Sequence, residues 1–208
     1  MDFTVSSEEV CYGSPALRTG QAEIIKDLIN KNLDYISRIG ANTVITACAG
    51  CYRTFKIDYP KILGKELPFK VLHISEFLSQ IIPNNNLKLK NDKSFKIAYH
   101  DPCHLGRHSG VFDEPRNIIS SIENVEFIEM HRNRENAWYC GAGGGVKSGF
   151  KDWAVEIASE RIKEAEKTGA DILITNCPFC VRNLKDASNK LNSNLKIMGI
   201  VELIKDLI

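Results

Sequence analysis

The side chains with the most distinctive chemistry in this sequence of 208 residues are its seven cysteines. Four of them lie beyond residue 100, and these are Cys103, Cys140, Cys177 and Cys180. Thiolates are soft metal ligands, and four that converge on one point can hold a [4Fe–4S] cluster or a zinc ion. Whether an iron–sulfur cluster or a zinc ion is favoured depends on the spacing of these cysteines and on the elements expected to position them.

The surroundings of these four cysteines suit a metal centre. Cys177 and Cys180 form a C-x-x-C pair where a β-branched run passes into a helical pattern. Both can point at one metal from the start of a helix, where exposed N–H groups favour thiolate over thiol. Cys140 precedes Gly141-Ala-Gly-Gly-Gly145, a backbone without side-chain bulk that can approach a large cofactor. Cys103 follows an expected strand, and ligands in open α/β sheets collect at the carboxyl edge.

The chain contains an internal duplication. YISRIGANTVITACAGC at 35–51 aligns with EAEKTGADILITNCPFC at 164–180, and the agreement continues between 68–82 and 193–208. The first half therefore carries three related cysteines, which are Cys11, Cys48 and Cys51. It has no equivalent of Cys103, because the block at 95–138 has no counterpart before Cys11. We expect the first unit to be incomplete at its N-terminus.

Strand and helix patterns alternate along the chain. Helical spacing of apolar residues predicts helices near 24–36 and 153–165, and Ser75 is expected to cap a helix over 76–82. Pro115 suits the first turn of a further helix. Short strands rich in Val, Ile, Leu or Phe are expected at 43–47, 69–73, 95–99, 125–129, 171–175 and 195–198.

This alternation predicts an α/β fold of two pseudo-repeated small units. Each unit is expected to have a short parallel sheet with its cysteines at the carboxyl ends of the strands. The first unit spans 1–84 and the second 94–208, and the polar stretch at 83–93 is the predicted linker between them.

Charge and hydropathy exclude several classes of function. Lys and Arg total 27 and Asp and Glu total 26, so no strong field would attract nucleic acid. No apolar run approaches the roughly 18 residues of a membrane span, and the start MDFTVSSEEVC is not a signal peptide. We expect a cytoplasmic protein with no nucleic-acid partner and no membrane span of its own. In a reducing cytosol the cysteines are not expected to form disulfides.

Several segments in combination resemble the cysteine-rich CCG domain of iron–sulfur oxidoreductases. They are VCYGSPALRTGQ, YHDPCHLGRHSGVFDEPRNI, WYCGAGGGVKSGF and ITNCPFC, and they are most similar to the D-type subunit of heterodisulfide reductase. The iron–sulfur subunits of glycolate, lactate and anaerobic glycerol-3-phosphate dehydrogenases belong to the same family. The resemblance implies one [4Fe–4S] cluster in the second unit and an incomplete second site in the first. Its ligands would be Cys103, Cys140, Cys177 and Cys180, with Cys11, Cys48 and Cys51 at the incomplete site.

The sequence departs from the family's pattern at two positions. The family motif has two adjacent cysteines before the glycine, whereas Tyr12 and Tyr139 each replace one of them here. In heterodisulfide reductase the full set of five cysteines holds a noncubane cluster, so the choice between cubane and noncubane stays open.

The resemblance also implies a role and a partner. The implied role is that of a redox subunit exchanging electrons with a thiol/disulfide or hydroxy-acid-oxidising system. The implied partner is a subunit carrying ferredoxin-type clusters, flavin or haem, through which the chain would reach a membrane.

Two alternatives to a catalytic role stay open, a four-cysteine zinc scaffold and a non-catalytic electron relay. Common zinc modules close within about 15–20 residues, whereas these cysteines are spread over 103–180. A glutaredoxin-like dithiol enzyme would explain Cys177 and Cys180 but not the other cysteines. His104, Arg107 and His108 are candidates either for hydrogen bonding and charge near a cluster or for a plain surface role.

Overall fold

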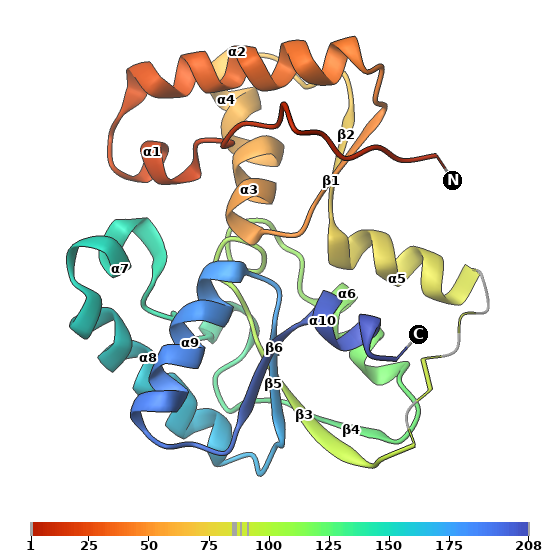
Figure 1. Cartoon of the computed structure of the whole chain (residues 1–208), viewed down its shortest axis with the longest axis vertical. Helices are drawn as coiled ribbons and strands as arrows, with labels where there is room; N and C mark the ends of the chain where they lie inside the picture. Colours follow the sequence, from red (N-terminus) through yellow and green to blue (C-terminus); the bar gives the residue numbers. More distant parts are fainter. Residues whose placement is uncertain (1, 85–86, 88, 91, 208) are drawn as a thin grey trace.

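The computed structural model describes residues 2–84, 87, 89–90 and 92–207, and it has two parallel β-sheets flanked by helices (Figure 1). The smaller sheet pairs β1 (Thr43–Thr46) with β2 (Lys70–His73). The larger sheet has the order β4-β3-β5-β6, and its strands are β3 (Phe95–His100), β4 (Val125–Ile128), β5 (Ile172–Thr175) and β6 (Lys196–Gly199). All described strand pairs are parallel, so the α/β class predicted from the sequence is confirmed.

Helices from the first part of the chain surround the smaller sheet, in the upper half of Figure 1. They are α1 (Ser14–Arg18), α2 (Ala22–Arg38), α3 (Ala49–Arg53), α4 (Tyr59–Leu63) and α5 (Ile74–Asn84). A π-helical turn, Thr54–Asp58, joins α3 to α4. The longest of these helices, α2, buries Ile25, Ile29, Asn32 and Ile36. That spacing of three or four residues places them on one face of the helix.

The larger sheet is covered on both faces. Its helices are α6 (Asp113–Ser120), α7 (Val146–Gly149), α8 (Lys151–Glu166), α9 (Pro178–Lys190) and α10 (Ile200–Lys205). Short 3-10 turns lie at Arg134–Asn136 and Gly143–Gly145. In Figure 1, α8 and α9 lie on one side of the sheet, and α6 and α10 lie on the other. Strand β5 is buried along its whole length, as expected of a central parallel strand.

The duplication read from the sequence is visible in the backbone. Strand β1 leads into α3 as β5 leads into α9, and β2 leads into α5 as β6 leads into α10. The helix starts also match in detail. A carboxylate of Glu76 accepts the backbone N–H of His73 at 2.8 Å, and Glu202 accepts that of Gly199 at 2.8 Å. The larger sheet has two further strands, β3 and β4, beyond those that repeat.

One of two apolar cores runs through both parts of the chain. It contains Ile29 and Phe55 from the first part together with Leu173 and Leu184 from the second. Three cysteines belong to the same core, namely Cys140, Cys177 and Cys180. A second core lies on the other face of the larger sheet, under α6 and α10. The cysteines therefore lie where the two parts of the chain pack together, which we call the seam.

Two details differ from the sequence prediction. Helix α5 begins at Ile74 rather than after a Ser75 cap, because the Ser75 hydroxyl contacts Nδ1 of His73 at 2.8 Å instead. In the predicted linker at 83–93, positions 85, 86, 88 and 91 lie outside the described residues. Leu89 is fully buried and pairs with Ile122, so this part packs against the second unit.

Among the described residues, no helix combines the length and apolar character needed to cross a membrane.

Candidate functional site

Both C-x-x-C pairs lie where a strand gives way to a helix. Cys48 and Cys177 are the N-cap residues of α3 and α9, each with an extended backbone, and Cys51 and Cys180 occupy the third helical position. The first N–H groups of a helix have no intrahelical partner. Backbone N–H groups of Cys51 and Gly50 therefore help to stabilise the Cys48 thiolate.

The fold brings the two C-x-x-C pairs together at the seam. The Cys48 and Cys177 side chains, one from each repeat, lie within hydrogen-bonding reach of each other. This interaction, followed by the one with the Cys51 thiol, lowers the pKa of Cys48. The sequence patterns predict two separate ligand sets, one in each half, whereas the structure makes them neighbours. Of the four cysteines in the two C-x-x-C pairs, Cys48 is therefore the one that favours the deprotonated, thiolate form.

Cys140 approaches the seam from the glycine-rich loop. Its Sγ lies 3.1 Å from Sγ of Cys180, and both side chains are buried. The hydrogen bond from the Cys180 thiol lowers the pKa of Cys140, against the opposing effect of burial. The ligand atoms of Cys140, Cys180 and His100 lie within 4.8 Å of one another. Neither Cys103 nor Cys177 belongs to this tight group.

His100 is a site residue that the sequence patterns did not reveal. It ends β3 and is buried, and its Nδ1 accepts a hydrogen bond from Nε of Arg161 at 3.0 Å. A neutral imidazole has one donor and one acceptor nitrogen, so its proton is then on Nε2. That atom has no hydrogen-bond partner among the described residues, and the His100 ring lies close enough to Cys140 for the two side chains to interact. His100 is therefore arranged as an N–H donor towards the cysteines.

The remaining two cysteines lie at the edges of the seam. Cys103 is half-buried, and burial raises the pKa of its thiol, as does the charge of Cys140. Arg107 and Arg53 act in the opposite direction on Cys103. Cys11 is exposed, and it lies near enough to Cys51 for their charges to interact.

The two tyrosines that replace family cysteines pack against neighbouring side chains. The ring of Tyr12 contacts that of Phe55, with centroids 4.6 Å apart. The Arg107 guanidinium lies 4.6 Å from the centroid of the half-exposed Tyr139 ring. Arg107 also donates to the carbonyl oxygens of Glu135 and Ala137. It thus holds the chain before Cys140 in place.

Buried polar atoms without partners cluster around the cysteines. Buried polar groups are normally hydrogen-bonded, so a group of exceptions needs an explanation. At the carboxyl ends of the described strands these atoms include Thr46 Oγ1, His73 Nε2, His100 Nε2, Thr175 Oγ1 and both amide atoms of Asn176. They end β1, β2, β3 and β5 or, for Asn176, directly follow the strand. Soft thiolates surrounded by unpaired donors fit a sulfur-rich metal cofactor, whose sulfides accept hydrogen bonds.

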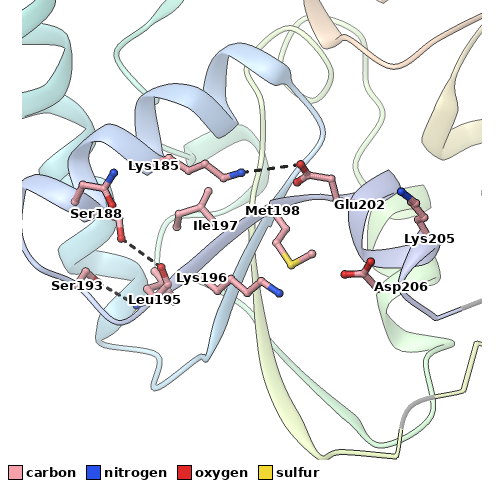
Figure 2. Close-up of a pocket in the computed structure, with 11 residues that line it drawn as sticks. Lys185, Ser188, Ser193, Leu195, Lys196, Ile197, Met198, Glu202, Lys205 and Asp206 are labelled. Atoms are coloured by element: carbon pink, nitrogen blue, oxygen red, sulfur yellow. Dashed lines mark hydrogen bonds and ion pairs between the residues drawn. The ribbon is translucent and has the colours of Figure 1, made fainter.

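Two hollows lie near α9. One, of about 610 Å³, reaches Cys177 and Asn176 from the second unit and Ala47 and Ile74 from the first. The other, of about 570 Å³, lies along β6 between α9 and α10 and is lined mainly by charged and polar side chains (Figure 2). Of these two, the first borders the seam.

Comparison with known proteins adds to this geometry. Residues 1–56 and 97–185 match the family described as "CCG: Cysteine-rich domain". This chain belongs to that family. It is 46% identical over 205 residues to the D-type subunit of a dihydromethanophenazine:CoB–CoM heterodisulfide reductase from Methanosarcina barkeri, a match that covers 97% of this chain and 50% of the relative.

Other relatives are also similar. The B-type subunit of a fumarate reductase (CoM/CoB) from Methanothermobacter marburgensis is 43% identical over 98% of this chain and 40% of its own length. The probable iron–sulfur-binding oxidoreductase FadF from Bacillus subtilis is 29% identical over 96% of this chain and 28% of its own length. The chain thus spans half or less of the length of these relatives.

Proposed function

We propose that this chain is an iron–sulfur redox subunit that passes electrons to or from a thiol/disulfide or hydroxy-acid-oxidising system. The observation that carries the proposal is the seam, where Cys48 meets Cys177 and Cys140 meets Cys180. The names of the relatives support it, since they describe a heterodisulfide reductase and an iron–sulfur-binding oxidoreductase. A thiol/disulfide system fits best, because the reactive groups at the seam are thiols and thiolates.

The proposed ligands of one [4Fe–4S] cluster are Cys103, Cys140, Cys177 and Cys180. Cys11, Cys48 and Cys51 would form the incomplete second site. When bound, such a cluster supplies one-electron redox chemistry. The protein's own contributions are the thiolates, the Nε2–H of His100 directed at Cys140, and a buried setting that excludes water.

A partner subunit is part of the proposal. All seven cysteines lie at the seam or its edges, so electrons would reach the seam from redox centres that these cysteines do not hold. We propose a partner subunit with ferredoxin-type clusters, flavin or haem, and a membrane would be reached only through it. The proposed units are 1–84 and 94–208, each contributing one C-x-x-C pair.

A structural zinc site is the second candidate, because Cys140, Cys180 and His100 form a compact group of possible ligands. The hydrogen bond from Arg161 argues against it. With Nδ1 of His100 accepting that bond, Nε2 of the neutral ring carries a proton and has no lone pair for zinc. The group then supplies two ligands rather than three.

Anaerobic reconstitution tests this function. The full chain should turn brown and bind about four iron and four sulfide ions per second-unit site. Zinc, iron and sulfide are measured together, in protein purified without oxygen and after reconstitution. Stoichiometric zinc without sulfide in the native material would establish the zinc scaffold instead.

A further inference from the structure

Each sheet has a strand that ends in a buried histidine close to a C-x-x-C turn. His73 is the last residue of β2 and pairs in register with Thr46, and His100 is the last residue of β3 and pairs with Thr175. A C-x-x-C pair begins two residues after each of these threonines. Because the strands are parallel, both histidines lie at the sheet edge from which the cysteines extend. We call His73 and His100 the seam histidines.

The seam histidines do not correspond to each other by the internal duplication. Strand β2 corresponds to β6, where Gly199 pairs with Thr175 in the place that His73 has in the first repeat. His100 comes instead from β3, on the other side of β5. The described part of the first repeat has no strand that corresponds to β3. The same side chain therefore reaches the cysteines from two unrelated positions, which duplication alone does not explain.

Both imidazole rings are held in the same tautomer. Nδ1 of His73 accepts the backbone N–H of Ser75 at 3.2 Å, and Nδ1 of His100 accepts the Nε–H of Arg161 at 3.0 Å. Burial lowers the pKa of His73 to about 4 and also lowers the pKa of His100, so both rings are neutral at neutral pH. A neutral ring whose Nδ1 is an acceptor carries its proton on Nε2. Each seam histidine thus has one Nε2–H bond to donate.

These Nε2–H donors lack an acceptor in the protein. Neither Nε2 atom has a hydrogen-bond partner within the described part of the chain, and both side chains are buried away from water. The hydroxyl oxygens of Thr46 and Thr175 are buried and unpartnered in the same way. A buried donor without an acceptor costs free energy, so such a group of donors needs an explanation. An acceptor among the cysteines would provide one.

Each seam histidine interacts with a different cysteine. The ligand atoms of His100 and Cys140 lie within 4.8 Å of each other, and the two side chains interact. The charge of Cys48 acts on His73, and the His73 ring also interacts with the backbone of Asn176 from the other repeat. His73 therefore lies beside the first-unit cysteines and His100 beside the second-unit cysteines.

We propose that the seam histidines donate their Nε2–H bonds to sulfur at the seam, one in each repeat, and that the His100 donor raises the reduction potential of the second-unit centre. A hydrogen bond to sulfur stabilises the reduced form more than the oxidised form, because reduction adds negative charge. Arg161 acts only through His100 and is a positioning residue. The effect on the potential rests on the proposed function, whereas the donors can be observed without a cluster.

Nitrogen-15 NMR of the cluster-free, reduced full chain observes the donors directly. At neutral pH and without oxygen, both rings should show a protonated Nε2 and an unprotonated Nδ1. Cys48→Ala should shift the Nε2–H resonance of His73 and leave that of His100 in place. Cys140→Ala should do the reverse, so each variant is the control for the other. A protonated Nδ1 in either ring, or resonances that respond to neither replacement, would overturn the proposal.

The midpoint potential of the reconstituted chain, read from its absorbance during titration with dithionite, tests the consequence. His100→Phe removes the donor and keeps a flat ring. It should shift the equilibrium with a one-electron titrant about tenfold towards the oxidised form, a fall of about 59 mV. His100→Gln keeps an N–H donor and should restore part of this loss. His131→Phe is the matched control, because His131 is an exposed histidine in the loop after β4.

An unchanged potential in His100→Phe, at unaltered iron and sulfide content, would also overturn the proposal. If the unaltered chain binds no iron, the proposed function has failed, and the NMR result alone then decides whether the donors exist. A His100→Phe chain that does not fold is recognised by its narrow range of amide proton shifts. The comparison of Cys48→Ala with Cys140→Ala, which leaves both histidines in place, then decides.

Discussion

Cys48 and Cys177, the N-cap residues of two helices in different repeats, lie within hydrogen-bonding reach of each other. Each ends a strand–helix turn of the same type, so the internal duplication has brought two equivalent thiols to one place. The arrangement joins two ligand sets that are far apart in the sequence. A change in the protonation or bonding of a cysteine in one repeat can therefore affect the cysteines of the other repeat.

Mild oxidation of the cluster-free chain should form two disulfides, Cys48–Cys177 and Cys140–Cys180. The sulfur atoms of Cys140 and Cys180 lie 3.1 Å apart, and Cys177 acts on the pKa of Cys48 more strongly than Cys51 does. Peptide mapping without reduction identifies the bridges. Cys11 is the control and should stay free, because it is exposed at the edge of the seam. Predominant C-x-x-C disulfides within each repeat would contradict the arrangement.

Loss of the third-position cysteine should affect the two repeats unequally. Cys180→Ser leaves three of the four proposed second-unit ligands, and cluster binding is coupled to folding. Cys51→Ser alters a set that already has only three cysteines. We expect Cys180→Ser to abolish most of the cluster absorbance and Cys51→Ser to reduce it less. Iron content and absorbance of both variants, reconstituted side by side, provide the measurement. Equal losses would mean that the first-unit site is fully occupied.

Removal of the Arg161 guanidinium should destabilise the fold strongly. Arg161 is completely buried and bonds to His100, to Glu164 and to the carbonyl oxygen of Arg132. Arg161→Met would remove the closer of the two arginines that pair with the Glu164 carboxylate and would leave His100 Nδ1 without its donor, at a cost of about 3 kcal/mol, while Arg132 stays in contact with Glu164. Urea denaturation of the cluster-free chain measures this loss. Lys163→Met is the matched control, since its pair with Glu160 is exposed and contributes about 0–1 kcal/mol. Similar losses in both variants would contradict the buried network.

His73 should make the stability of the cluster-free chain depend on pH. Burial lowers the pKa of His73 from 6.5 to about 4, so the unfolded chain binds this proton more tightly than the folded chain does. Its contribution is therefore fully present above pH 6.5 and is lost as the pH falls towards 4, by about 3 kcal/mol. Urea denaturation across this range should show a smaller loss for His73→Gln. An unchanged pH dependence would exclude His73 as a source.

The local features of the fold could be predicted from sequence because their causes are local. The six predicted strands lie within one residue of the observed bounds, since each is a short β-branched or apolar run ended by turn residues. The predicted start of α5 is wrong, because Ser75 has an alternative partner in His73 that no capping pattern reveals. The Cys177–Cys180 pair lies at a helix start, as the sequence predicts, and the Cys48–Cys51 pair does so as well.

The assembly of the site could not be predicted in the same way. The contact of Cys48 with Cys177 depends on how two units pack, and no periodicity contains that information. His100 was missed although a signal was present, since it is a polar residue at the end of the apolar strand FKIAYH and shortly before Cys103. Arg161 was hidden within a helix rich in charged residues, where burial of one arginine cannot be distinguished from exposure of its neighbours.

The shared apolar core limits how molecules can enter. Ile29 and Phe55 from one repeat and Leu184 from the other belong to one continuous interior, so swinging the repeats apart would expose these side chains to water. The two repeats are therefore not expected to open and close about the seam. Entry has to use openings that already exist, such as the 610 Å³ hollow that reaches Cys177. Small changes in the side chains that line such a fixed opening would then control which molecules can reach the cysteines, without any movement of the backbone.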